Sequence, residues 1–438
     1  MARLPTYPIL NVFSNSILVG KLNKQANGAV EFSYTPEWLK WPGATPISLS
    51  IPLWGSKFEG QNVTSFFENL LPDNEAIRKK VALRVHAKGS DAYSLLDAVG
   101  RDCVGALQFL PQGMEPAPAG QVKGKPVSDD EIAKMLENLA AVPLGLREDE
   151  DFRISLAGAQ EKTALLYAEE KWQKPIGTTA TTHILKPQIG WQNGVDLSRS
   201  VENEFFCLKL VKALGIPAAD VDIKEFAGKH VLAVKRFDRL WAKDGRLFRL
   251  PQEDFCQALS VPPSLKYESQ GGPGLEEILM LLMGSDTPQQ DQATLLKAVI
   301  VFWLLAATDG HAKNFSLHLW PGGRFNLAPL YDVISVEPNI KAGQLFEGKV
   351  KLSMAVGERK HYQISKIQPR HFIETAAKAG IKAPLVEQVF DDLCKRATAA
   401  IRKVKKELPE DFPTDISEPI LAGFKKRLKI IKERNKEA

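Results

Sequence analysis

The spacing of hydrophobic residues changes along the chain from a period of two to a period near 3.6. Short alternating runs bounded by turns occupy residues 1–112, and apolar strand-like runs recur within residues 152–234. A capping box at residues 128–131 and an amphipathic pattern from Ser200 predict two helices in this part. From Pro251 the pattern is mainly helical apart from one hairpin. We therefore predict an α+β protein with a mixed N-lobe and a mainly helical C-lobe.

One almost uniformly apolar run, residues 295–307, predicts a helix buried in the core. The end of this buried helix would fix the position of the segment that follows it, Asp309-Gly-His-Ala-Lys-Asn314. Period-two residues then suggest a strand, the Pro-Gly-Gly turn at 321–323 reverses the chain, and a second short strand leads to Asp332. Such a hairpin would bring Asp332 back beside Asn314.

This set of polar residues suits the transfer of a phosphoryl group from ATP with Mg²⁺. The reaction needs a carboxylate that accepts the proton of an incoming hydroxyl, and oxygen ligands for the metal. Asp309 is the candidate base, and Asn314 and Asp332 are the candidate ligands. The Asp-to-Asn spacing equals that of the protein-kinase catalytic loop. By itself the segment fits a surface turn equally well, and its place after a buried helix favours a site.

Further upstream, residues 155–162 combine small residues with a lysine, so backbone N–H groups could approach phosphate oxygens. A tight turn between strands is the competing interpretation. Lys186 ends a strand-like run, where a kinase lysine reaches the phosphates, although strand-end lysines are usually solvated. Glu202 or Glu204 could pair with Lys186, or both could be first-turn acids of a helix; the sequence does not choose.

The apolar run 231–234 leads into Lys235-Arg236-Phe237, as a kinase strand leads into the hinge that binds adenine. The order of these features along one chain indicates a two-lobed protein-kinase-like fold.

The chain also resembles the HipA family, the serine/threonine kinase toxins of bacterial toxin–antitoxin pairs. The segments that carry this resemblance are residues 19–22, 32–35, 66–73, 152–166, 233–239, 250–254, 266–269, 271–274 and 307–316. They span nearly the whole chain in the same order.

The resemblance implies a role for each matching residue, with ATP and Mg²⁺ as cofactors. Asp309 would be the catalytic base, and Asn314 and Asp332 the metal ligands. Ser155 would be autophosphorylated, which switches the kinase off. The ATP-binding residues would be Ala157, Gly158, Ala159, Gln160, Glu161, Lys162, Lys186, Lys235, Arg236, Phe237, His311, Ala312, Lys313, Asn314, Tyr331 and Asp332.

The resemblance further implies partners. They are a small helix-turn-helix antitoxin (HipB-like), operator DNA that the complex represses, and a protein substrate such as an aminoacyl-tRNA synthetase, glutamate-tRNA ligase for example. Lys378 and Lys382 lie where family members touch DNA. The basic runs 402–406 and 425–434 fit a solvated helix face better than a DNA contact. Two other functions stay open: a catalytically silent corepressor, and a small-molecule phosphotransferase.

The resemblance implies a bacterial cytoplasmic enzyme, and the composition agrees with a globular protein of the cytosol. The net charge is only +5, the four cysteines are scattered without metal spacing, and we identify no signal peptide or membrane span. We predict three parts: residues 1–112, a β-rich subdomain; 113–250, a linker helix and the ATP-binding part of the N-lobe; and 251–438, a helical C-lobe with the catalytic and metal-binding loops. Three N-terminal tryptophans, at positions 38, 41 and 54, fit packing better than ligand stacking.

Overall fold

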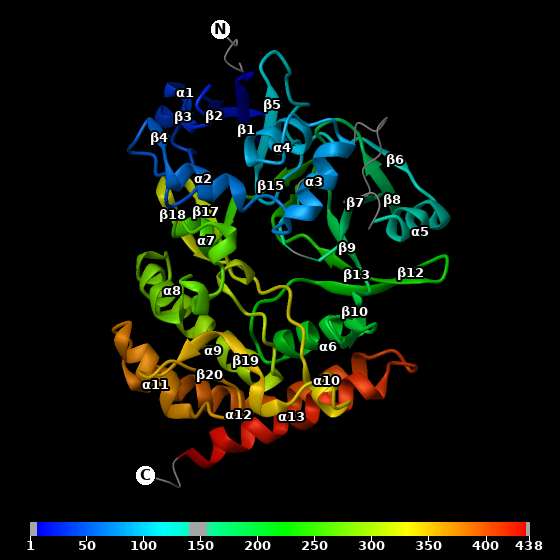
Figure 1. Cartoon of the computed structure of the whole chain (residues 1–438), viewed down its shortest axis with the longest axis vertical. Helices are drawn as coiled ribbons and strands as arrows, with labels where there is room; N and C mark the ends of the chain where they lie inside the picture. The colour runs from blue at the N-terminus through cyan, green and yellow to red at the C-terminus, as the bar shows by residue number, and fades with distance from the viewer. Residues whose placement is uncertain (1–6, 140–155, 159, 435–438) are drawn as a thin grey trace. The chain divides into compact units, whose positions relative to one another are not determined.

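The computed structural model describes residues 7–139, 156–158 and 160–434 (Figure 1). The chain forms two compact units, each built from separate segments. The first unit comprises Met1–Pro187, Lys224–Ser264 and Leu317–Phe325, and the second comprises Gln188–Ile223, Leu265–Ser316 and Asn326–Ala438. Each unit is described by itself below.

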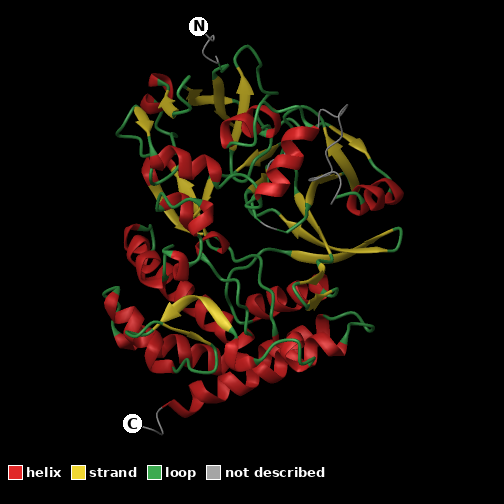
Figure 2. Ribbon diagram, in the orientation of Figure 1, coloured by secondary structure: helices red, strands yellow, loops and turns green. Residues whose placement is uncertain are grey.

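The first unit holds most of the strands (Figure 2). Its strands are β1 (Leu10–Ser14), β2 (Ile17–Lys24), β3 (Val30–Tyr34), β4 (Lys57–Glu59), β5 (Leu107–Pro111), β6 (Gly124–Pro126), β7 (Thr163–Ala168), β8 (Lys171–Pro175), β9 (His183–Pro187), β13 (Lys229–Lys235), β14 (Arg239–Trp241), β15 (Leu247–Arg249) and β16 (Gln252–Asp254). Strands β12 (Val221–Phe226), β17 (Ser316–Trp320) and β18 (Arg324–Leu327) contain residues of both units. Its helices are α1 (Pro36–Lys40), α2 (Gln61–Glu68), α3 (Glu75–Arg84), α4 (Ala92–Val99), α5 (Asp129–Glu137) and α7 (Phe255–Ala258).

An antiparallel sheet with the order β4-β3-β2-β1-β5 forms the N-terminal part of this unit. Its alternating pattern buries one face, and α2 and α4 cover the same core as strand residues such as Phe32 and Phe109. Phe66 and Phe67 of α2 are almost completely buried there. The segment 66–73 thus enters the core before the chain turns at Pro72 and Asp73.

A second sheet, with the order β12-β13-β9-β7-β8-β6, carries the residues that the sequence assigns to ATP. Strand β9 lies between β13 and β7, and Leu232 of β13 faces Lys186 of β9 in the register. The apolar face of α5 packs on this sheet through Ile132, Met135 and Leu136. The capping box of Ser128 and Glu131 that opens α5 is confirmed.

The second unit is mainly helical. Its elements are β10 (Gly190–Gln192), β11 (Val195–Leu197), α6 (Ser200–Ala213), α8 (Leu275–Leu281), α9 (Pro288–Leu305), α10 (Glu337–Lys341), β19 (Lys351–Val356), β20 (His361–Gln363), α11 (Pro369–Lys378), α12 (Ala383–Glu407) and α13 (Thr414–Glu433). Helix α9 is buried along the predicted apolar run, and α6, α12 and α13 pack against it. Among the described residues, no helix combines the length and the apolar character needed to cross a bilayer.

The α+β fold class, with one mixed and one mainly helical part, is confirmed, but one sequence prediction is wrong. Pro251 does not open a helix, because the next residues form β16, whose neighbour in a three-stranded sheet is β17. The helix follows at Phe255, and Asp254 caps it by accepting a bond from the Gln257 N–H. Pairing between strands overrides the local preference at Pro251. The stretch after residue 332 is mainly helical, as predicted, and also contains the hairpin of β19 and β20 within residues 351–363.

Candidate active site

The predicted catalytic loop is a tight turn that leaves the buried end of α9. The helix stops at Ala306, whose φ of +50° lies in the left-handed region. Within the loop the His311 N–H donates to the Asp309 carbonyl at 2.9 Å, and the Asn314 N–H donates to the His311 carbonyl at 2.9 Å. Gly310 is required, because a Cβ at this position would lie 2.6 Å from the Phe302 ring. The loop is therefore a compact turn that directly follows the buried end of α9.

The side chains of Asp309 and Asn314 are placed differently. The Asp309 side chain is 64% exposed, so its carboxylate can be reached by a substrate. Asn314 is buried, and its Nδ2 donates to the Asp309 carbonyl at 2.6 Å. Because the amide nitrogen is used by the loop, the amide oxygen is the atom of this side chain that could bind a metal.

Tyr331 returns to this loop, as the predicted hairpin requires. Its hydroxyl donates to the Lys313 carbonyl at 2.8 Å and lies 2.6 Å from Ser316 Oγ. Asp332 follows with a φ of +61°, a conformation that costs a residue with a Cβ about 1–3 kcal/mol and that concentrates at functional sites. Pairing of Leu330 with residues 217–219 holds this backbone.

His311 and Tyr267 flank the Asp309 carboxylate. His311 is buried, and its Nε2 lies 3.8 Å from Asp309 Oδ1. The Tyr267 hydroxyl donates to the same Oδ1 at 2.9 Å. Tyr267 has no predicted role of its own; its place in the matching segment 266–269 is the one sequence signal for it.

The phosphate-loop candidates lie in the first unit. Ser155 and Ala159 fall outside the described residues. Gly158 has a φ of +103° and forms a parallel bridge with Pro72, while its carbonyl accepts a bond from the Asp73 N–H at 3.2 Å. Gln160 Nε2 donates to the Pro187 carbonyl at 3.3 Å, which ties the loop to the end of β9. The loop is therefore anchored at two points.

Lys162 and Lys186 are both buried, with 7% and 6% of their surface exposed. The Lys162 ammonium lies directly over Gly158, since a Cβ there would sit 2.6 Å from Nζ. Lysine is rarely buried unless its charge is paired, so Lys186 is not the solvated strand-end lysine that was the competing interpretation. Glu202 accepts a bond from Gln188 at 2.8 Å, and Glu204 is buried, which leaves the choice between them open.

The turn that anchors Gly158 is itself fixed by Arg78. Its Nε donates to the Pro72 carbonyl at 2.6 Å, and its guanidinium also forms an ion pair with Glu68. Sequence analysis cited segment 66–73 only as part of the resemblance. Its structural role is to support the candidate phosphate loop.

At the predicted hinge, two groups of Arg236 are already bonded within the protein. The Arg236 N–H already donates to the Thr182 carbonyl at 2.9 Å, and its guanidinium is buried against Asp238 and Asp102. Neither group can bind a nucleotide without breaking these bonds. Lys235 is exposed, and the Phe237 ring packs edge-on against His318 with the ring centres 5.5 Å apart.

Asp102 lies at the centre of a buried ion cluster next to this hinge. Its partners are Arg236, Arg239, Arg249 and Thr181. Burial alone would raise the pKa of Asp102, but the guanidinium groups of Arg239, Arg249 and Arg236 together hold it well below its usual range. The cluster joins the α4–β5 connection to the hinge, so its role is structural.

The residues fit a magnesium ion that is held mainly by phosphate oxygens. In the described ranges, no group of three or more His, Cys, Asp or Glu side chains could hold a metal alone. Asn314 and Asp332 together offer one amide oxygen and one carboxylate. Mg²⁺ commonly takes one or two carboxylates and completes its shell with water and substrate phosphates.

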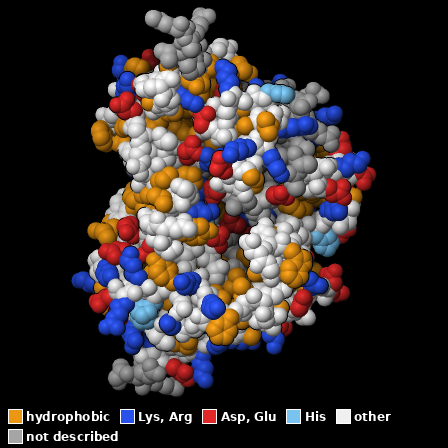
Figure 3. Space-filling model, viewed as in Figure 1, with side chains coloured by type: hydrophobic (Ala, Val, Ile, Leu, Met, Phe, Trp, Pro, Cys, Tyr) orange, Lys and Arg blue, Asp and Glu red, His pale blue; other side chains and the backbone are white. Residues whose placement is uncertain are grey.

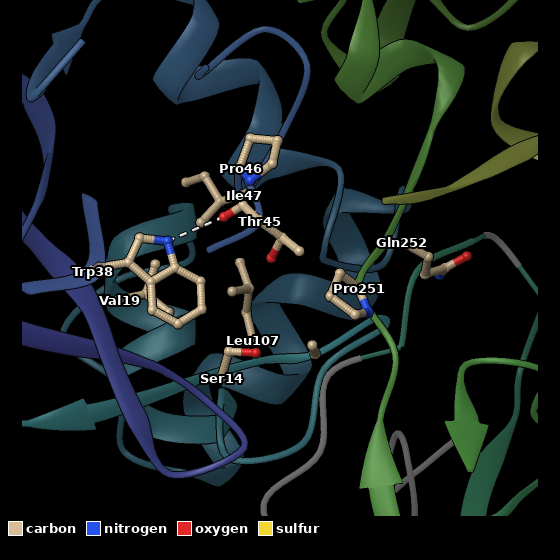
Figure 4. A pocket seen from close by; sticks show the side chains of 10 residues that line it. Ser14, Val19, Trp38, Thr45, Pro46, Ile47, Leu107, Pro251 and Gln252 are labelled. Atoms are coloured by element: carbon tan, nitrogen blue, oxygen red, sulfur yellow. Dashed lines mark hydrogen bonds between the residues drawn. The ribbon is translucent and has the colours of Figure 1, made fainter. Parts of the chain in front are cut away.

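Of the three N-terminal tryptophans, Trp38 is buried and lines a cavity of about 10 Å³ (Figure 4). Its indole N–H donates to the Thr45 carbonyl at 3.1 Å. This volume has room for about one water molecule, so the cavity is no nucleotide site. Trp54, in contrast, is 87% exposed.

The two candidate DNA contacts are accessible. Lys378 ends α11 and Lys382 precedes α12, and both side chains are exposed. Figure 3 shows Lys and Arg side chains at its lower left, where Figure 1 places α11.

Gly158→Ala should weaken ATP binding. The added Cβ would lie only 2.6 Å from Lys162 Nζ and displace the ammonium, and alanine is strained at a φ of +103°. We expect the half-saturating ATP concentration to rise about tenfold or more, measured by calorimetric titration with ATP–Mg²⁺. Gly177→Ala is the matched control, because its φ is also positive but nothing lies near its Cβ. Equal affinities in the two variants would contradict the assignment.

Comparison with known proteins places these features in a family. Residues 154–401 match the model of the HipA-like C-terminal domain, and residues 10–110 match the HipA N-terminal domain. The protein Y4mE of Sinorhizobium fredii, named as a kinase, is 34% identical over 408 residues, which cover 92% of this chain and 93% of that protein. The serine/threonine-protein kinase toxin HipA of Shewanella oneidensis is 29% identical over 341 residues, 75% of each chain.

A solved structure of a HipA protein has a similar fold. The complex of Shewanella oneidensis HipA, HipB and operator DNA contains a chain that superimposes with a TM-score of 0.79 at 25% identity, covering 97% of this chain and 98% of that one.

Proposed function

The chain belongs to the HipA family, and from this premise we propose that it is an ATP–Mg²⁺-dependent serine/threonine-protein kinase that acts as the toxin of a toxin–antitoxin pair. The observation that carries the proposal is the loop after α9. It combines a reachable carboxylate at Asp309 with a buried Asn314 whose amide nitrogen is bonded to the loop, which leaves the amide oxygen as the candidate metal ligand.

In the proposed reaction, Asp309 accepts the proton of a serine or threonine hydroxyl while that oxygen bonds to the γ-phosphorus of ATP. The bond from the γ-phosphorus to the bridging oxygen breaks, and ADP leaves. Lys162, Lys186 and the backbone around Gly158 would bind phosphate oxygens, and Asn314 and Asp332 would hold the metal. When bound, Mg²⁺ neutralises the charge that develops on the phosphates.

We further assign the off-switch to Ser155. A phosphate on Ser155 would add nearly two negative charges beside the loop that holds the ATP phosphates, and would repel them. The ties of Gly158 to Asp73 and of Gln160 to Pro187 are the bonds that would have to break if the loop were expelled.

The partners follow from the relatives. We propose a small helix-turn-helix antitoxin as the restraining partner, and operator DNA bound by the complex, with Lys378 and Lys382 as direct contacts. The protein substrate would be a component of translation, such as an aminoacyl-tRNA synthetase. The solved relative in complex with HipB and operator DNA supports the first two partners only.

A panel of acceptors tests the proposed function. The chain is incubated with γ-labelled ATP–Mg²⁺ and either purified aminoacyl-tRNA synthetases, including glutamate-tRNA ligase, or hydroxyl-bearing metabolites. The proposal expects label on a serine or threonine of a protein, and none with Asp309→Asn. Label on a metabolite alone would favour the small-molecule phosphotransferase. Operator repression with the antitoxin, but without any transfer, would favour the silent corepressor.

A further inference from the structure

We propose that Tyr267 is a positioning residue that orients the catalytic carboxylate of Asp309. The inference rests on the proposed function, because it concerns the same reaction. It starts from the 2.9 Å hydrogen bond that the Tyr267 hydroxyl donates to Asp309 Oδ1. Asp309 is largely exposed, so without a partner its carboxylate would rotate among several orientations.

Tyr267 is itself held in place by the glycine-rich turn that follows it. The N–H groups of Gln270 and Gly272 both donate to the Tyr267 carbonyl at 3.0 Å. Gly271 has a φ of +91°, and a Cβ on Gly272 would lie 1.8 Å from the Leu265 carbonyl oxygen. Only glycine fits both positions. The Gly-Gly-Pro-Gly segment is thus a structural turn that fixes the backbone of Tyr267.

The neighbouring strand β19 (Lys351–Val356) aligns Tyr267 with the catalytic loop. Glu268, the next residue after Tyr267, accepts a bond from the Ala355 N–H at 2.6 Å and forms an ion pair with Lys360 at 3.2 Å. The Ser353 hydroxyl, on the same strand, donates to the Thr308 carbonyl at 2.6 Å. One strand therefore anchors the residue after Tyr267 and the residue before Asp309.

The ring of Tyr267 also contacts the loop. It packs edge-on against the buried His311 ring, with centroids 5.0 Å apart and an angle of 81° between the ring planes. His311 Nε2 and the Tyr267 hydroxyl both face Asp309 Oδ1. The Tyr267 hydroxyl is thus the group that hydrogen-bonds Oδ1, with the His311 ring packed beside it. A base must be oriented toward the hydroxyl whose proton it takes, and this bond restricts the orientation of the carboxylate.

Tyr267→Phe removes the hydroxyl and keeps the ring, so it tests the hydrogen bond to Asp309 apart from the ring packing. We expect the turnover number for the protein acceptor found in the panel to fall about tenfold or more, because the hydrogen bond to a charged group is lost. The KM for ATP should stay within about twofold, since Tyr267 has no part in phosphate binding. In the Asp309→Asn background the same change should have no further effect on the residual rate, because its target is gone.

Tyr362→Phe is the matched control. It removes the hydroxyl of a partly buried tyrosine on β20 of the same unit, and we expect wild-type turnover within about twofold. Wild-type turnover of Tyr267→Phe would overturn the inference and leave the proposed function standing. Equal losses in both tyrosine variants, or an additive loss in the Asp309→Asn background, would also overturn it. A wild-type chain that transfers no phosphate to any acceptor would overturn both proposals.

Discussion

Asp309→Asn should abolish phosphate transfer and leave the fold intact. An asparagine has nearly the same shape but accepts no proton, and loss of a general base typically costs about 10²- to 10⁴-fold in rate. The fold should survive because the loop uses the backbone carbonyl of residue 309, which accepts bonds from the His311 N–H and Asn314 Nδ2. Single-turnover rates with ATP–Mg²⁺ and thermal melting curves measure the two effects.

Asp411→Asn is the control for this prediction. Asp411 is an exposed aspartate in the same unit, and its substitution should leave the rate unchanged. If Asp309→Asn melts at the wild-type temperature but retains more than about a tenth of the wild-type rate, Asp309 is not the base.

Asp102→Asn should destabilise the first unit strongly. The change leaves three buried guanidinium groups, of Arg236, Arg239 and Arg249, with only one carboxylate, that of Asp238. Removing one partner of a buried ion pair costs about 3–5 kcal/mol. We expect the urea midpoint of the unfolding of this unit to fall markedly, as measured by the fluorescence of its tryptophans.

The control for this prediction is Asp244→Asn, which breaks an ion pair with Arg246 whose two side chains are each 54% exposed. Exposed pairs are worth about 0–1 kcal/mol, so this variant should unfold close to wild type. Equal midpoints for the two variants would contradict the structural role of Asp102.

At acidic pH the wild type should lose its higher free energy of unfolding relative to Asp102→Asn. The arginines lower the pKa of folded Asp102, so its carboxylate stabilises the folded state at any pH above the unfolded value of about 3.9. This contribution is lost as the pH falls from there toward the folded pKa. The difference between the wild type and Asp102→Asn should therefore shrink below about pH 4 and stay constant between pH 6 and 8.

Elements with a strong local signal could be predicted from the sequence. The apolar run 295–307 lies mostly in α9, the Ser128 capping box opens α5, and the turn at 321–323 joins β17 to β18. In each case the residues that carry the sequence pattern form the predicted element or lie within a few residues of it. The helix predicted from Pro251 is wrong because the preference of proline for the first turn of a helix is weak. The residues that follow Pro251 form a strand because they pair with β17, much later in the chain.

The residues that support the site could not be predicted, because their contacts join distant parts of the chain. Tyr267 meets Asp309 across 42 residues, and Asp102 meets Arg249 across 147. No periodicity or spacing signals such pairs. Arg236 was assigned to a hinge that binds adenine through its backbone, and the burial of its side chain against Asp238 and Asp102 has no signal in the sequence.

The central claim is that this chain transfers phosphate from ATP to a protein hydroxyl through Asp309, and intact-mass spectrometry tests it most directly. The purified chain, dephosphorylated first if it already carries phosphate, is weighed before and after incubation with ATP–Mg²⁺, beside Asp309→Asn. The account predicts the gain of one phosphate, mapped to Ser155, in the wild type and none in the variant. A wild-type chain that gains nothing, or a variant that gains phosphate at the wild-type rate, would contradict it.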